Sequence, residues 1–160
     1  MNKVCLLTHV ADADGAFPIV LAKLVFKDLE VFSCEVNEVD SVLSSILLHE
    51  EDYKNIYVVD LCMSEAMASQ INENEKWKSK IKVFDHHASR LTLNQFSFIS
   101  VIDEQNGRKE CGTSLFFQYL KKFYSNAWLL KPCVAEMIEL VRQGDTFAFT
   151  EEKEKDAFSF

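Results

Sequence analysis

Asn55-Ile-Tyr-Val-Val-Asp60 is an apolar run, rich in β-branched and aromatic residues, that ends in an acid. This composition predicts a strand buried inside a sheet. Similar runs stand before and after it in the chain, at Lys3–Thr8 and Ile81–Phe84, and each is followed by polar or acidic residues. We therefore expect several buried strands whose ends bear acids and histidines.

Segments with helical periodicity separate these strands. The apolar spacing predicts helices over 16–29, 39–49, 64–74, 113–123 and 132–142, with Pro18 in a first helical turn, where it is tolerated. Two further strands are expected over 31–36 and 96–102. Strands that alternate with helices predict an α/β, Rossmann-like three-layer sandwich, in which a mostly parallel five-stranded sheet has helices on both faces.

Composition excludes several classes of protein. The chain has 160 residues, 48% of them hydrophobic, and its 17 basic and 25 acidic residues give a net charge of −8. It is long and apolar enough for one folded domain, and no apolar stretch approaches the roughly 18 residues of a membrane span. The acidic balance argues against a broad basic track for duplex nucleic acid. Five widely spaced cysteines with no C-x-x-C pair favour reduced thiols in a cytoplasmic protein.

Chemistry-bearing residues follow the expected strands. Sites in open parallel sheets lie beyond the carboxyl ends of the strands, so residues at these ends should meet in one cleft. In chain order they are His9, Asp12, Asp14, then Asp60, then Asp85, His86 and His87, then the helix start Gly112, Thr113 and Ser114, and finally Asp145. Asp12 and Asp14, two residues apart, are unfavourably close unless a cation or a shared proton compensates their charges. Taken singly, each residue also has a structural interpretation as a loop acid, a helix cap or a turn former.

The ordered blocks resemble the DHH family of metal-dependent phosphoesterases. The match extends over nearly the whole chain and consists of the acidic motif from His9 to Gly15, Asp60, the tripeptide Asp85-His86-His87, and Asp145-Thr146 followed by Phe147. The segment Gly112-Thr113-Ser114-Leu115 is similar to the branch of short-oligonucleotide ribonucleases.

The resemblance implies two divalent cations, commonly Mn²⁺, with Mg²⁺ or Co²⁺ as alternatives. Residue by residue it implies one ion held by His9, Asp12 and Asp60, and a second held by Asp14, Asp60, His86 and Asp145. Asp85 would orient an imidazole, and His87 would contact the phosphoryl group as a general acid. Together the cations would lower the pKa of a shared water for in-line attack on phosphorus.

Substrate contacts are expected at two places. The helix start at Gly112, Thr113 and Ser114 suits an anion, and Arg108 with Lys109 is a local basic pair that either grips a substrate phosphate or only maintains surface solubility. Family enzymes usually have a smaller C-terminal domain with a glycine-rich substrate-binding motif, which this sequence does not contain. We therefore expect a catalytic domain over 1–150 and a charged segment over 151–160, read as a solvated helix or a linker.

The preferred function is a Mn²⁺-dependent phosphoesterase that hydrolyses small phosphorylated substrates, foremost short oligoribonucleotides or bisphosphorylated nucleosides. A pyrophosphatase or polyphosphatase is the alternative within the same class. From other classes, a phosphoacceptor receiver module would use Asp12, Asp14 and Asp60 around one Mg²⁺, and a catalytically idle scaffold would bind metal without turnover. No duplex nucleic acid or membrane partner is expected, and oligomerisation is left open.

Overall fold

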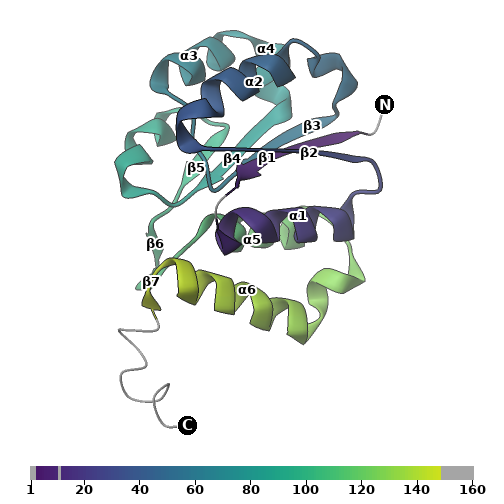
Figure 1. Cartoon of the computed structure of the whole chain (residues 1–160), viewed down its shortest axis with the longest axis vertical. Coiled ribbons are helices and arrows are strands. Elements are labelled where there is room, and N and C mark those ends of the chain that lie inside the picture. Colours follow the sequence, from purple (N-terminus) through teal and green to yellow (C-terminus); the bar gives the residue numbers. More distant parts are fainter. Residues whose placement is uncertain (1–2, 11, 149–160) are drawn as a thin grey trace.

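A parallel sheet forms the centre of the molecule. The computed structural model describes residues 3–10 and 12–148. The sheet consists of β1 (Val4–His9), β2 (Leu29–Cys34), β3 (Asn55–Val59), β4 (Ile81–Asp85) and β5 (Ile99–Val101). The strand order is β2-β1-β3-β4-β5, and every neighbouring pair is parallel. The α/β sandwich predicted from the sequence is confirmed (Figure 1).

Helices cover both faces of this sheet. On one face lie α2 (Val39–Leu47), α3 (Glu65–Glu73) and α4 (Glu75–Lys80) (Figure 1). On the other face lie α1 (Ala13–Val25) and α5 (Gly112–Phe123), against which α6 (Pro132–Asp145) packs (Figure 1). Short 3₁₀ helices occupy residues 36–38, 50–52, 88–95 and 127–130.

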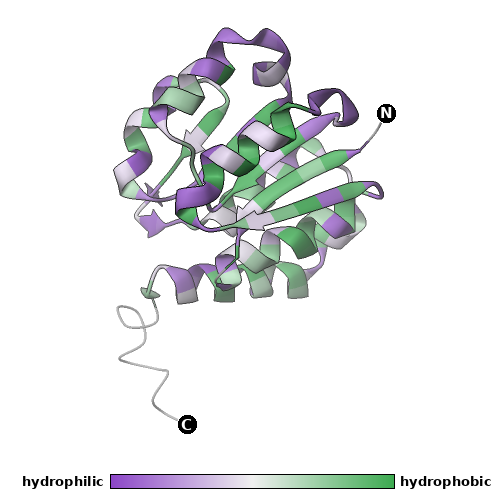
Figure 2. Cartoon of the chain, turned by 45° about the horizontal axis from the view of Figure 1, so that its top comes forward, coloured by the Kyte–Doolittle hydropathy of each residue, from purple (hydrophilic) through white to green (hydrophobic). Residues whose placement is uncertain are grey.

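Alternate residues of each strand enter different hydrophobic cores. Ile56 and Val58 of β3 belong to the core under α2 and α3, whereas Tyr57 and Val59 belong to the core under α1 and α5. All four are fully buried. A strand with both faces covered has no position for a polar residue, which explains its continuous apolar sequence (Figure 2).

Two predicted boundaries were wrong near the start of the chain. The second strand begins at Leu29 rather than 31, because Glu30 lies in this edge strand, where its carboxylate pairs with Lys3 and accepts a hydrogen bond from Tyr53. The first helix begins at Ala13 rather than 16, because the Asp12 side chain caps it. It ends at Val25 rather than 29, because Phe26 is already extended and β2 begins at Leu29.

Other short elements escaped prediction. The helix α4, the 3₁₀ turn over 88–95, and a hairpin of β6 (Glu104–Gln105) and β7 (Arg108–Lys109) were not expected, and β5 is shorter than the predicted strand. The hairpin turns at Asn106 and Gly107, which have φ of 56° and 75°. Two positive φ values are typical of the tight turn that joins antiparallel strands.

Three further observations concern the composition. Among the described residues, no helix is both long enough and apolar enough to cross a bilayer. All five cysteines are free thiols, four of them buried and Cys133 exposed. The charged segment expected over 151–160 lies outside the described residues.

Candidate metal centre

The carboxyl ends of the three central strands bring the motif residues together. His9 is the last residue of β1, Asp60 follows β3 directly, and Asp85 is the last residue of β4. Because β1, β3 and β4 are adjacent and parallel, these ends lie at one edge of the sheet. Asp14 in the first turn of α1 and Asp145 at the end of α6 reach the same edge from the helical layer.

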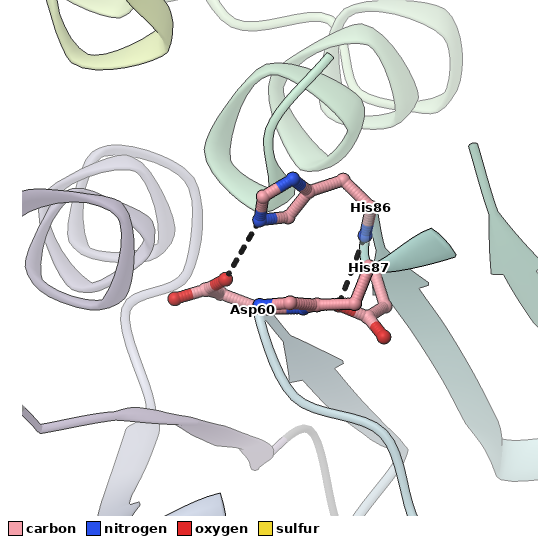
Figure 3. A group of neighbouring side chains, drawn as sticks. Asp60, His86 and His87 are labelled. Atoms are coloured by element: carbon pink, nitrogen blue, oxygen red, sulfur yellow. Dashed lines mark hydrogen bonds and ion pairs between the residues drawn. The ribbon is translucent and has the colours of Figure 1, made fainter. Parts of the chain in front are cut away.

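His86 lies among three carboxylates. Its Nε2 is 3.3 Å from Asp60 Oδ1, 3.4 Å from Asp145 Oδ2 and 3.8 Å from Asp14 Oδ2. Figure 3 shows the His86 imidazole pointing at the Asp60 carboxylate. The side chains of Asp14 and Asp60 are almost completely buried. Ligand atoms of Asp14, His86 and Asp145 lie within 4.8 Å of one another, the spacing of groups that could share one cation.

A second group of potential ligands surrounds His9. Its Nδ1 is 3.4 Å from Asp12 Oδ2 and 3.8 Å from Asp60 Oδ2, while its Nε2 is 3.5 Å from Glu35. Asp12 uses its other oxygen, Oδ1, to accept a hydrogen bond from Gly15 N at 2.9 Å. The carboxylate of Asp60 therefore reaches both groups, with one oxygen directed to each.

Unpartnered buried atoms indicate that a cation fits here. His86 Nε2, Asp145 Oδ2 and Asp85 Oδ2 are buried without a hydrogen-bond partner among the described residues. Buried polar atoms normally have a partner, because leaving one unpaired costs about 1–3 kcal/mol. A divalent cation would satisfy the imidazole nitrogen and the Asp145 oxygen together, and mixed imidazole and carboxylate donors suit Mn²⁺ and similar ions.

The backbone of Asp60 is strained. Its φ is 59°, in the left-handed region that residues other than glycine, asparagine and aspartate rarely adopt. Burial, followed by the charge of Asp14, raises the pKa of the Asp60 carboxyl to about 7, although His86 opposes the rise. Strained conformations and raised carboxyl pKa values are concentrated at functional sites, which supports such a role for Asp60.

The other titratable groups of the cluster are also perturbed. Burial alone would lower the pKa of His86, but contact with Asp60 and the charges of Asp145 and Asp14 outweigh it and raise this pKa to about 9. Burial, together with the charge of Asp14, raises the pKa of Asp145. Both shifts reflect the negative charge concentrated at this site, which favours protonated His86 and disfavours ionised Asp145, and which bound cations would offset.

Asp85 orients both histidines. Its Oδ1 accepts a hydrogen bond from the main-chain N–H of His86 at 2.9 Å and lies 2.7 Å from His87 Nδ1. This contact raises the pKa of His87, whose ring is half exposed at the rim of the site. The contact thus holds the His87 ring in place through Nδ1.

The start of α5 binds an anion that belongs to the chain itself. Gly112 N and Thr113 N donate hydrogen bonds of 2.7 and 2.8 Å to the two carboxylate oxygens of Asp14. Ser114 is buried and donates to Glu110 at 2.5 Å. The sequence predicted that this helix start binds a substrate anion, whereas in the structure its N–H groups bind the Asp14 carboxylate.

Two glycines permit close approach between the motif loops. A Cβ atom on Gly15 would lie 2.3 Å from the carbonyl oxygen of His9, and one on Gly112 would lie 2.7 Å from Asp60 N. Real Cβ atoms do not tolerate such distances to backbone atoms. The two glycines therefore allow α1 and α5 to press against the ends of β1 and β3.

Pro18 explains why Thr113 is needed. The predicted first-turn position of Pro18 was wrong, because the proline lies inside α1, four residues after Asp14. Having no N–H, Pro18 cannot donate to the Asp14 carbonyl, and the Thr113 hydroxyl donates to that carbonyl instead, at 2.8 Å.

We expect Thr113→Val to lower the free energy of unfolding by about 1–2 kcal/mol, because it leaves the Asp14 carbonyl buried and unpaired. In a Pro18→Ala background the new amide can donate to that carbonyl, so the same substitution should be less damaging. Urea unfolding of the four chains in this double-mutant cycle measures the coupling. Equal losses in both backgrounds would contradict the compensation.

Arg108 and two residues that the sequence did not single out complete the surroundings. Arg108, half exposed in β7, forms an ion pair with Glu139 of α6. Its charge is therefore already paired within the chain, and the predicted contact with a substrate phosphate stays a prediction. Glu35 next to His9 was missed, although it follows β2 at the same edge of the sheet. Arg90 was also missed, although it comes three residues after His87 and lines a cavity beside the site.

Comparisons with known proteins find a related sequence and a related fold. Over 154 residues the chain is 31% identical to oligoribonuclease NrnB of Bacillus subtilis (strain 168), an alignment that covers 91% of this chain and 37% of that protein. A crystal structure of an uncharacterized protein from Helicobacter pylori G27 has the same fold, with a TM-score of 0.73 and 22% identity over 92% of this chain and 44% of the other. A scan against protein-family models finds no match.

The relationship to the ribonuclease extends over almost the whole of this chain, which spans 37% of the ribonuclease's length. The cluster of aspartates and histidines has the composition of the metal centre in the family that the sequence resembles. The chain is a homologue of the DHH-family phosphoesterases.

Proposed function

We propose that the chain is a Mn²⁺-dependent phosphoesterase that hydrolyses short oligoribonucleotides or bisphosphorylated nucleosides. The observation on which this depends most is the position of Asp60, whose two oxygens face the His9 group and the His86 group. Homology to an oligoribonuclease supports the choice of a short ribonucleotide substrate. The acidic net charge of −8 also favours a short substrate over a long strand, which needs rows of basic residues.

Two cations account for the arrangement of the ligands. We assign His9, Asp12 and Asp60 to one ion, and Asp14, Asp60, His86 and Asp145 to the other. When bound, a pair of such ions supplies an activated water and neutralises phosphoryl oxygens. A receiver module with a single Mg²⁺ would leave His86 and Asp145 without a role, so the geometry favours the hydrolase.

The remaining residues have supporting roles in this proposal. His87, held by Asp85, donates a proton to the leaving oxygen. Gly112 and Thr113 fix the Asp14 carboxylate from the start of α5, and Ser114 fixes the same turn through Glu110, so these three residues position a ligand rather than touch substrate.

Metal binding should be visible as a gain in thermal stability. A ligand at about 100 times its Kd that binds only the folded state stabilises it by about 2.7 kcal/mol, or about 5–10 °C in Tm for a domain of this size. We expect Mn²⁺ to produce such a shift in differential scanning fluorimetry and EDTA to reverse it. An unchanged Tm across a Mn²⁺ titration would contradict the metal centre.

Turnover is tested on a small panel with Mn²⁺ present. The panel contains a 5′-phosphorylated RNA dinucleotide, adenosine 3′,5′-bisphosphate, a cyclic dinucleotide and pyrophosphate. Release of nucleotide or phosphate from the first two would support the proposal, and release from pyrophosphate alone would favour the pyrophosphatase alternative. Metal binding without turnover of any substrate would indicate the scaffold.

A further inference from the structure

A small cavity adjoins the proposed metal centre on the side of the 3₁₀ turn that follows His87. Its volume is about 100 Å³. Asp60, Asp85 and His87 form the wall that it shares with the centre, and Ser89 and Arg90 line it from the turn. A ligand in this cavity would therefore lie next to a phosphoryl group held at the centre.

Arg90 has no partner for its charge. Among the described residues, no hydrogen bond or ion pair reaches its half-buried guanidinium, whereas Arg108 and Arg142 both pair with Glu139. The backbone of Arg90 is nevertheless fixed, since its N–H donates to the His87 carbonyl at 2.8 Å.

The chemistry of the lining suits a phosphate. A guanidinium offers a planar set of donors that matches two phosphate oxygens at once. Each carboxylate on the shared wall lies near a histidine: Asp85 Oδ1 is 2.7 Å from His87 Nδ1, and Asp60 is 3.3 Å from His86 Nε2. Among the described residues, the second Asp85 oxygen, Oδ2, has no hydrogen-bond partner. Arg90 and the exposed Ser89 hydroxyl are the lining groups left to donate to a ligand.

We propose that Arg90, assisted by Ser89, forms a subsite for a terminal phosphate adjacent to the phosphate that is cleaved. The chain then selects substrates with two neighbouring phosphates, such as 5′-phosphorylated dinucleotides and nucleoside bisphosphates, over those with a free 5′-hydroxyl. This inference rests on the proposed function and adds a residue that determines substrate preference.

The kinetic test compares one RNA dinucleotide with and without its 5′-phosphate. A charged hydrogen bond of this kind contributes about 10- to 100-fold in affinity, so kcat/KM of the full chain should favour the phosphorylated form by that factor. Arg90→Gln should abolish the preference through KM and leave the 5′-hydroxyl substrate unaffected. Arg90→Lys should retain part of the preference, because it keeps the charge but not the planar donors.

The control for lost charge is Lys76→Gln, an exposed lysine on α4, which should retain the full preference. If Arg90→Gln keeps the preference, or slows both substrates equally, the subsite is refuted.

A second readout does not depend on turnover. The chain has three arginines, so their side-chain Nε–Hε signals can be resolved by NMR in the Mg²⁺-loaded protein. Addition of inorganic phosphate should shift the signal that Arg90→Gln removes and leave the other two in place. An unmoved Arg90 signal refutes the subsite even if the chain hydrolyses dinucleotides, and a shifted signal supports it even if the proposed hydrolysis is not observed.

Discussion

Asp60→Asn is expected to lower Mn²⁺-dependent hydrolysis on the order of 10³-fold, a loss of about 4 kcal/mol of transition-state stabilisation. Asp60 faces His9 through Oδ2 at 3.8 Å and His86 through Oδ1 at 3.3 Å, so one neutral amide would weaken both cation positions. Asparagine is the appropriate replacement because it has nearly the same shape and tolerates the φ of 59°. Turnover of the 5′-phosphorylated dinucleotide measures the loss of activity, and calorimetry with Mn²⁺ measures the loss of metal affinity.

The metal-free Asp60→Asn protein should be at least as stable as the wild type. Burial raises the pKa of Asp60 to about 7, so near neutral pH the folded state resists the charge that the unfolded chain accepts freely. A neutral amide removes that penalty, and the loss of activity cannot then be attributed to unfolding. Asp28→Asn removes an exposed acid and is the matched control, with activity and Mn²⁺ binding unchanged. An Asp60→Asn enzyme with near-normal turnover would contradict the bridging role.

Gly112→Ala is expected to destabilise the fold by about 3 kcal/mol and to abolish the Mn²⁺-induced rise in Tm. The added Cβ would lie 2.7 Å from Asp60 N and 2.8 Å from its Cα and Cβ, and these backbone atoms cannot move aside as a flexible side chain would. Relief requires α5 to retreat, which withdraws the two N–H donors from Asp14, or Asp60 to shift, which separates the ligand groups. Urea unfolding with and without Mn²⁺ measures both effects.

Gly107→Asn provides the comparison for Gly112→Ala. A Cβ on Gly107 would meet no atom within 4 Å, and asparagine accepts the positive φ of this hairpin position. We expect its stability and its response to Mn²⁺ to match those of the wild type. If Gly112→Ala behaves like Gly107→Asn, the close approach of α5 to Asp60 is not what holds the centre together.

Sequence patterns predicted the sheet well because its strands have both faces covered. The run from Asn55 to Asp60 and the run ending at Asp85 needed no tertiary information, and the parallel arrangement then placed their acids at one edge. The hydrophobic pattern failed to predict strand boundaries where the position of a residue depends on a partner distant in the sequence. Glu30 lies in an edge strand because it has Lys3 and Tyr53 as partners, which no local periodicity reveals.

The same distinction applies to the candidate site. The ligand types followed from residue identity and position after a strand, but the partners of Arg108 and Gly112 could not be predicted. Arg108 pairs with Glu139 of α6, and the start of α5 binds Asp14. Both contacts join separate elements of the chain, so the sequence alone did not reveal that Arg108 has a partner. The sequence also gave no reason to single out Arg90.

The hydrogen bond from Gly112 to Asp14 joins residues 98 positions apart, and the ligand set itself extends from His9 to Asp145. Contacts of such long range form late in folding, because the entropy of closing the loop must be overcome before they contribute. During synthesis the first strands can emerge and collapse without the start of α5, so a nascent chain has no complete set of ligands. The proposed metal centre is therefore incomplete until the α/β domain is almost entirely made.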